Sequence, residues 1–217
     1  MVEYGGKRMR LRDSAAEARS IARAITSSHR RSRAIVLLGA KATYARVMQH
    51  LRETAFDVIH FTGHAWVKDG GSYMALYDHV VYGSELAMLL NRQPPALLFI
   101  NSHHTGFVPA FTSVAPLDLP PRSSNADMHA RLARRRFGFE YVAARVGVGS
   151  FVGCLGEPSD PAGRAFAEAT YRELLHGAPL ANALHLARAE TMTLGEITPY
   201  HTLMAGYPNL RLVATRS

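Results

Sequence analysis

The chain has 217 residues, of which 47% are hydrophobic and 19% are charged. This composition is typical of one folded globular domain and argues against general disorder. The formal net charge of +8 would attract acidic partners such as nucleic acid, but no zinc-finger, RNP or helix-turn-helix pattern accompanies the scattered basic residues.

The chain contains one cysteine, Cys154, which excludes an intramolecular disulfide and a zinc site built on several thiolates. No apolar run approaches the roughly 18 residues that a membrane helix needs, and the N-terminus has no basic-then-apolar signal segment. We therefore expect a cytoplasmic protein without membrane contact, with a single domain over residues 1–217.

The first part of the chain predicts helices that alternate with short apolar strands. Asp13 and Ser14 can cap a helix whose interior is rich in alanine, and Thr43 can cap a second helix. We expect helices over 13–27, 43–52 and from 84 or 85 to 90, buried strands over 34–38, 57–62 and 96–101, and a hairpin-like segment over 70–82.

Residues 107–133 interrupt this alternation. They are rich in proline and serine and would form an unusually long connection inside a compact domain. We expect a flexible loop there, because proline disfavours both helix and central strand. After it, the sequence predicts helices over 136–145, 160–175 and 180–192, and strands over 150–155, 203–205 and 210–213.

Nearly continuous apolar strands that alternate with helices predict the α/β class, with a mainly parallel sheet covered by helices on both faces. Such sheets place their chemistry at the carboxyl ends of the strands. Two consecutive strands of this chain are followed by histidine: His64 comes after the strand over 57–62, and His103-His104 come after the strand over 96–101. We therefore expect the functional site where these two strands end.

The same two strand ends carry a resemblance to a known family. Residues 60–64, HFTGH, resemble the "HFxGHG" segment of CHAT domains, which are members of the caspase and separase clan of cysteine peptidases. Residues 101–106, NSHHTG, resemble the family's "SACETG" segment. The further matches, in chain order, are 14–21 with the preceding helix, 137–155 with "FLxAGAxxVVxSL", 171–177 with "FYxxLxxG", 181–188 with "AlxxAq" and 206–212 with "GDPxLRL".

The resemblance implies a caspase-like sheet and a mechanism in which a cysteine attacks the peptide carbonyl while a histidine on the neighbouring strand end manages its protons. His64 stands at the position of that histidine. Thr105 and Gly106 align the second motif without a gap, so that His103 stands where the nucleophilic cysteine is expected. Imidazole cannot simply replace a thiolate, which must attack and later leave.

We therefore interpret the chain as a catalytically inactive CHAT domain that binds a protein or peptide partner. Its role would be regulatory or scaffolding, and the family context points to a bacterial signalling or defence assembly. Nucleic-acid binding through the net charge is a further possibility, for which the sequence offers no motif.

The main alternative is an active endopeptidase with an unorthodox site, cleaving after basic residues. Cys154 could supply a thiol from a strand near residues 96–101, although lone cysteines in apolar strands are usually inert core residues. His64, His103 and His104 could instead bind a transition metal, but the chain has 11 histidines and chance clustering competes with this idea. Our expectation is that no metal or other cofactor is bound.

Acidic and basic side chains complete the candidate site. The resemblance implies that Asp160 or Glu157 could hold a basic side chain of a bound peptide through a charge-assisted hydrogen bond, although both could equally be plain surface carboxylates. In caspase-like peptidases the chain between the nucleophile strand and the following helix often carries a processing site. Here that interval ends in Arg134-Arg135-Arg136, and a disordered insertion without a role explains it equally well.

Overall fold

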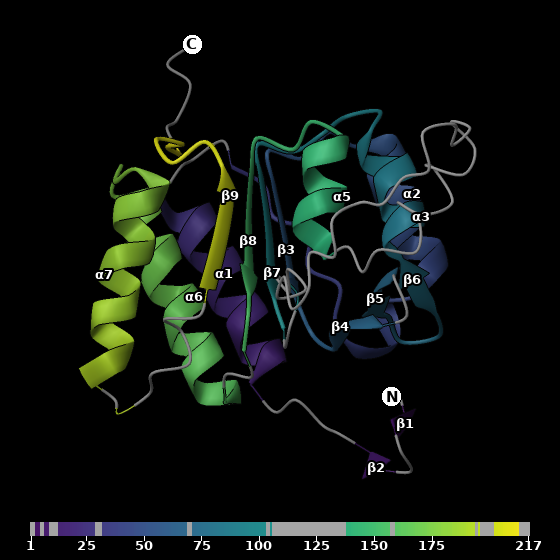
Figure 1. The fold of residues 1–217 in the computed structure, drawn as a ribbon, viewed down its shortest axis with the longest axis horizontal. Helices are drawn as coiled ribbons and strands as arrows, with labels where there is room; N and C mark the ends of the chain where they lie inside the picture. Colours follow the sequence, from purple (N-terminus) through teal and green to yellow (C-terminus); the bar gives the residue numbers. More distant parts are fainter. Residues whose placement is uncertain are drawn as a thin grey trace, which may run out of the picture.

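The computed structural model describes residues 3–4, 7–8, 13–28, 32–68, 71–102, 105, 138–156, 159–193, 195 and 202–212. Its central sheet has the order β3–β7–β8–β9 (Figure 1). Strands β3 (Val58–Thr62), β7 (Leu97–Asn101) and β8 (Ser150–Cys154) are parallel, and β9 (Thr202–Gly206) is antiparallel to β8. The predicted mainly parallel α/β sheet is therefore confirmed.

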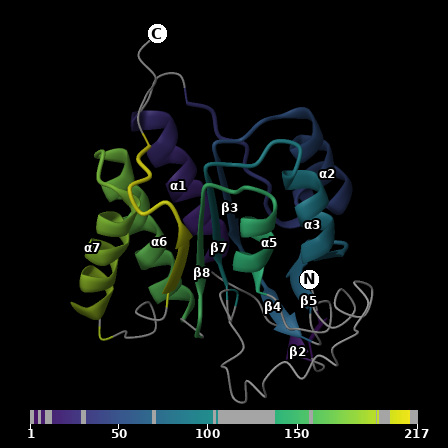
Figure 2. The same cartoon turned by 45° about the horizontal axis from the view of Figure 1, so that its top comes forward.

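Helices cover both faces of this sheet (Figures 1 and 2). On one face lie α1 (Ser14–Ser28), α6 (Asp160–Leu175) and α7 (Leu180–Thr193). On the other face lie α2 (Tyr44–Glu53), α3 (Gly83–Leu90) and α5 (Phe139–Arg145). Each layer has its own buried core, because successive residues of a strand point to opposite faces. Strand β7 shows this directly, since Leu97 and Phe99 join the first core while Leu98 and Ile100 join the second.

A second, antiparallel sheet leaves the end of the central sheet at which β3 and β7 finish. It has the order β4–β5–β6 and consists of β4 (Ala65–Lys68), β5 (Gly71–Ala75) and β6 (Val80–Tyr82). The sequence predicted the hairpin over 70–82 but missed β4, which follows His64 directly. A short ladder also joins β1 (Glu3–Tyr4) and β2 (Lys7–Arg8).

Local chemistry explains several element boundaries. The Thr43 hydroxyl accepts a hydrogen bond from the backbone N–H of Arg46, as an N-cap does, and Ser159 accepts one from Ala162 at the start of α6. Helix α6 ends at Leu175, and shortly after it Gly177 has a φ of 87°, in the left-handed region that glycine tolerates best. Of these residues, Thr43 is the cap that the sequence analysis predicted, whereas the capping role of Ser159 was not predicted.

Two predicted strands are wrong. Residues 34–38 pair with no strand that the structure describes, and the chain then enters the short 3-10 helix η1 (Gly39–Lys41). Ile35 and Val36 are 48% and 36% exposed, so this apolar segment is not buried. Residues 210–212 form no strand either, because the chain turns after β9 and the Leu210 carbonyl accepts from the N–H of Leu180 at the start of α7. Residue 213 lies outside the described ranges.

Among the described residues, no helix is both long and apolar enough to span a bilayer.

Candidate functional site

Strands β3 and β7 end side by side. Thr62 and Asn101 are the last paired residues of their parallel ladder, and Gly63-His64 and Ser102 follow them. His64 is partly buried, and its carbonyl oxygen accepts a hydrogen bond from the backbone N–H of Ala75 at 2.8 Å. This bond extends the β4–β5 ladder back to His64, so the histidine stands where the central sheet passes into the antiparallel sheet.

Ser102 fastens the two strand ends together. Its buried hydroxyl accepts from the backbone N–H of Ala65 at 2.7 Å and donates to the Ala65 carbonyl oxygen at 3.3 Å. The residue after β7 is thereby held against the residue after His64. Both hydrogen-bonding roles of this hydroxyl are used by backbone, which fits a structural part rather than a nucleophile.

Thr105 anchors the chain that follows β7. Its hydroxyl is fully buried, accepts from the backbone N–H of Cys154 at 3.0 Å, and donates toward the carbonyl oxygens of Ile100 (3.2 Å) and Ser102 (3.3 Å). Its own carbonyl oxygen accepts from the N–H of Phe139 at 3.2 Å. Thr105 therefore joins β7, β8 and α5 at one point.

Cys154 is the last residue of β8 and is 5% exposed. Burial raises the pKa of its thiol, and a hydrogen bond from the backbone of Gly156 offsets this only in part. A neutral, buried thiol is a poor nucleophile, because the thiolate is the attacking species. The surroundings of Cys154 therefore favour the role of an inert core residue.

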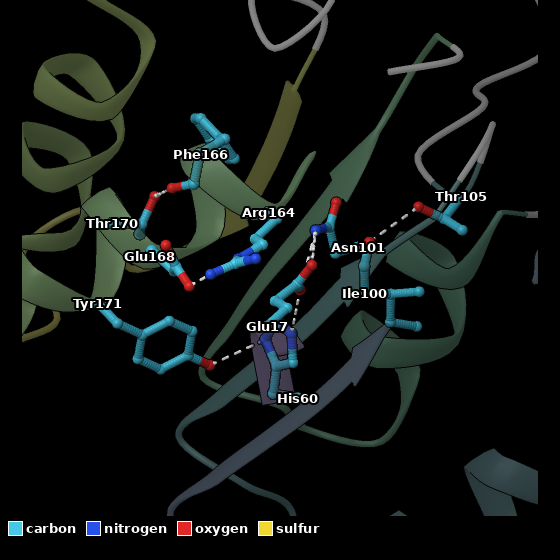
Figure 3. Close-up of polar contacts among 10 residues, drawn as sticks. All are labelled: Glu17, His60, Ile100, Asn101, Thr105, Arg164, Phe166, Glu168, Thr170 and Tyr171. Carbon is cyan, nitrogen blue, oxygen red and sulfur yellow. Dashed lines mark hydrogen bonds and ion pairs between the residues drawn. The ribbon is translucent and has the colours of Figure 1, made fainter. Parts of the chain in front are cut away.

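A buried polar network surrounds Asn101, the last residue of β7 (Figure 3). Glu17, on α1, is only 2% exposed. Its carboxylate accepts from the side-chain amide of Asn101 at 2.9 and 3.0 Å, and it lies 2.8 Å from Nε2 of His60. The Tyr171 hydroxyl lies 3.3 Å from Nδ1 of the same imidazole. Elements α1, β3, β7 and α6 thus each contribute one side chain.

The protonation state of Tyr171 fixes which ring nitrogen of His60 donates a hydrogen bond. Burial, together with the nearby charge of Glu17, raises the pKa of Tyr171 well above its usual value, so this phenol keeps its proton. It can therefore donate to Nδ1 of His60, which leaves Nε2–H free to donate to Glu17. A buried carboxylate is tolerated only when donors surround it, and His60 and Asn101 supply them here. The network holds the last residue of β7 on the face opposite to Ser102.

The sequence pointed to His60 through its motif but gave no role to Glu17, Asn101 or Tyr171. One signal was available: Glu17 lies four residues before Ile21, which is also buried, so both share one face of α1. An acidic residue on the buried face of a helix requires a partner inside the protein. A second signal was the polar Asn101 at the end of a fully apolar strand.

The remaining predicted site residues divide into two groups. Asp160 opens α6 and is partly buried, directly after the capping Ser159. In the same helix Gly163 lies beside Asn101, since a Cβ placed there would meet the amide oxygen of Asn101 at 3.2 Å. The other predicted residues lie outside the described part of the chain: His103, His104, Glu157, the segment 107–133 and Arg134, Arg135 and Arg136.

Metal binding by His64, His103 and His104 therefore stays an untested alternative to our expectation that no metal is bound. The described residues contain no group of three or more histidine, cysteine or acidic side chains placed to hold a metal ion.

The CHAT domain family model matches residues 6–204, which covers nearly the whole chain. No curated protein matches the sequence. The match includes both strand ends, the helix that carries Glu17 and the strand that carries Cys154. On this basis the chain belongs to the CHAT domain family, whose members are related to caspase-like peptidases.

Proposed function

We propose that this CHAT domain is catalytically inactive and that it binds a protein or peptide partner at the ends of β3 and β7. Its role would be regulatory or scaffolding, within a cytoplasmic bacterial signalling or defence assembly. One observation carries the proposal: in the family register, residue 103 is the nucleophilic cysteine, and in this chain it is histidine. The setting in a bacterial assembly rests on the family alone.

The chemistry of acyl transfer makes this substitution decisive. The attacking group must form an acyl bond that is stable enough to persist until water arrives, and thiolate sulfur meets that need. An acyl-imidazole is labile, and an imidazole ring has a different reach from a CH₂–SH group. His64 keeps its place, but it has no thiol to deprotonate at residue 103.

The other nucleophilic groups at the ends of β7 and β8 have structural partners. The Ser102 hydroxyl is occupied by both backbone groups of Ala65, and the Thr105 hydroxyl by Cys154 and by two carbonyl oxygens. The Cys154 thiol is buried, and its pKa is raised. Each observation favours a binding role over a relocated catalytic site.

The binding role needs a surface that recognises a partner. Asp160, at the start of α6, and Glu157 would hold a basic side chain of the partner through a charge-assisted hydrogen bond. His64 would serve as a hydrogen-bonding group of this surface. The net charge of +8 adds long-range attraction for acidic partners but carries no specificity.

Hydrolysis of a fluorogenic peptide panel with arginine or lysine before the cleaved bond tests the proposal. The wild-type protein and His64→Ala should give the same background rate. The matched control is His185→Ala, which removes an exposed histidine of α7. Turnover that persists in His185→Ala and disappears in His64→Ala would show an active endopeptidase and overturn the proposal.

A further inference from the structure

Residues 34–38, with the sequence AIVLL, form an apolar segment that the fold leaves uncovered. They pair with no strand that the structure describes, and none of them joins either of the two buried cores. Ala34 is exposed, and its neighbours Ile35 and Val36 are 48% and 36% exposed. We call residues 34–38 the unpaired segment.

The composition of the unpaired segment is that of a β-strand. It contains two β-branched residues and two leucines, without proline, glycine or charge. Every residue of such a segment carries a backbone N–H and a backbone C=O that a neighbouring strand can pair. Apolar strands that lack a neighbour in their own sheet are templates for pairing with another chain. The chemistry of the segment therefore favours recognition through the main chain.

The C-terminal end of the unpaired segment is held in place. Leu38 has the extended backbone angles φ −128° and ψ 141° and leads directly into η1. After η1, the Ala42 carbonyl oxygen accepts from the N–H of Tyr77 at 3.0 Å, and Tyr77 lies two residues beyond Ala75, which bonds to His64. The segment is thus tied to the hairpin that adjoins the candidate site. A tethered segment loses less freedom when a partner binds it.

Positive charges stand at both ends of the unpaired segment. Arg33 precedes it and Lys41 follows it after η1, and both side chains are exposed. Neither forms an ion pair with an acidic side chain of the described residues. A strand with a carboxylate near each end would place opposite charges beside Arg33 and Lys41, which stabilises strand pairing and fixes its register.

These charges also argue against two other occupants. A second copy of the segment in parallel register would set Arg33 beside its own counterpart, and an antiparallel copy would bring Arg33 toward Lys41, so that like charges meet in both cases. An anionic membrane would attract both cations, but its hydrocarbon offers no hydrogen-bond partner to the backbone of residues 34–38. A partner strand with acidic ends satisfies the charges and the backbone together.

We propose that residues 34–38 pair with an extended apolar segment of a partner protein that carries acidic residues at both ends. Main-chain hydrogen bonds of a β-ladder hold the two segments together, and side chains of the added strand cover Ile35 and Val36. This surface is additional to the one at the ends of β3 and β7. The inference therefore goes beyond the proposed function and does not depend on whether the domain is catalytically inactive.

Fluorescence anisotropy of the labelled peptide EDVTVTVDE, titrated with the full chain, tests the inference. Binding should be saturable with a Kd below about 1 mM, and the peptide KKVTVTVKK should bind at least about tenfold more weakly. The double variant Arg33→Glu, Lys41→Glu should reverse this order. The matched control is Arg52→Glu, Arg92→Glu, which makes the same change of net charge at two exposed residues and should keep the wild-type order.

Val36→Pro removes one backbone donor from the unpaired segment and should weaken binding of EDVTVTVDE at least about tenfold. Val36→Thr keeps the donor and the β-branched shape and should bind like wild type. Circular dichroism verifies that both variants are folded, as expected for an exposed residue without a described strand partner.

Four results would overturn the inference: no saturable binding, equal binding of the two peptides, Val36→Pro binding like wild type, or Val36-dependent association with vesicles of phosphatidylserine and phosphatidylcholine in place of the peptide. Sedimentation that shows a dimer of the chain, lost in Val36→Pro, would overturn it in favour of a second copy. The peptide hydrolysis assay separates the two ideas, because turnover refutes inactivity alone, whereas absent binding of EDVTVTVDE refutes the strand partner alone.

Discussion

Ser102 and Ala65 join the ends of the two strands on which the candidate site depends. The Ser102 hydroxyl bonds to both backbone groups of Ala65, at 2.7 Å to its nitrogen and 3.3 Å to its oxygen. Residue 64 precedes Ala65 and residue 103 follows Ser102, so the two family positions are each one residue away from this link. A fixed backbone at this point is what a two-residue catalytic site requires, and this chain keeps it with histidine at both positions.

Replacement of Glu17 should destabilise the domain strongly. Glu17→Ala leaves His60 and Asn101 without their buried acceptor, and we expect a loss of about 3 kcal/mol in the free energy of unfolding. Glu17→Gln should cost less, because it retains one acceptor oxygen. Urea unfolding measures both. The control is Glu190→Ala, which breaks an exposed ion pair with Arg172 and should change stability by less than about 1 kcal/mol. Equal effects of Glu17→Ala and Glu190→Ala would show that the buried network adds no more to the free energy of unfolding than an exposed ion pair does.

Thr105→Val tests the anchor between β7, β8 and α5. Valine keeps the shape of threonine but leaves the backbone N–H of Cys154 without a partner, which should cost about 2 kcal/mol. The variant should also be alkylated at Cys154 faster than wild type, because the end of β8 would open more often. Thr193→Val, at the exposed end of α7, is the matched control. Unchanged stability and unchanged alkylation would rule out the anchoring role.

The pH dependence of the free energy of unfolding should reveal the raised pKa of Glu140. Burial in the first turn of α5 raises the pKa of this carboxyl, with partial offset from the backbone N–H groups of Glu140 and Gly138, and its Oε2 has no hydrogen-bond partner among the residues that the structure describes. Because the folded-state pKa is the higher one, folding favours the protonated form. The contribution of protonated Glu140 to the stability of the fold is fully present below the usual glutamate pKa. It is lost as the pH rises through the raised pKa of the folded state.

Glu140→Gln should therefore stabilise the domain at pH 7, by about 1 kcal/mol, and the gain should shrink toward pH 4. Thermal or urea unfolding at the two pH values measures it. Glu53→Gln, at the exposed end of α2, provides the control. A Glu140→Gln variant that is less stable at pH 7 than at pH 4, relative to wild type, would contradict the assignment.

Limited trypsin digestion addresses the segment before α5. The sequence predicts early cutting at Arg134, Arg135 and Arg136, which a variant with glutamine at all three positions should remove. The two fragments should elute together on gel filtration, because β7 and β8 come from opposite sides of the cut and pair in the central sheet. Faster cutting at residues 30–33, with resistance at 134–136, would end the processing-loop hypothesis.

Much of the fold was readable from the sequence, because β7 is apolar and buried up to its last residue, and β3 and β8 are mostly apolar. The segment 34–38 has the same composition and was wrongly predicted as a buried strand. Composition records the tendency of a segment to be extended, whereas a strand also needs a neighbour that pairs with it. The sequence analysis missed β4, although this strand does have a partner. No turn signal separates β4 from His64, and its pairing with β5 depends on the hairpin.

The position of the candidate site was predictable from the sequence, but the hydrogen bonds that hold its backbone in place were not. The predicted strands placed residue 64 just after the end of β3, beside the end of β7, and the structure has it there. Its role in chemistry stays a prediction. The hydrogen bonds that join Ser102 to Ala65, Thr105 to Cys154 and Glu17 to Asn101 could not be foreseen, because each joins residues that are at least 37 positions apart. Such contacts depend on tertiary packing, which no local pattern encodes.

The most direct measurement introduces the missing nucleophile. The variant His103→Cys, combined with Cys154→Ala, should react rapidly and stoichiometrically with an arginyl chloromethyl ketone at residue 103, because a neighbouring histidine favours the thiolate. Adding His64→Ala should slow the reaction, and wild-type protein should label at Cys154 only after denaturation, because burial raises the pKa of that thiol. Rapid labelling of Cys154 in the native wild type, or an unreactive cysteine at residue 103, would contradict the account of an inactivated CHAT domain.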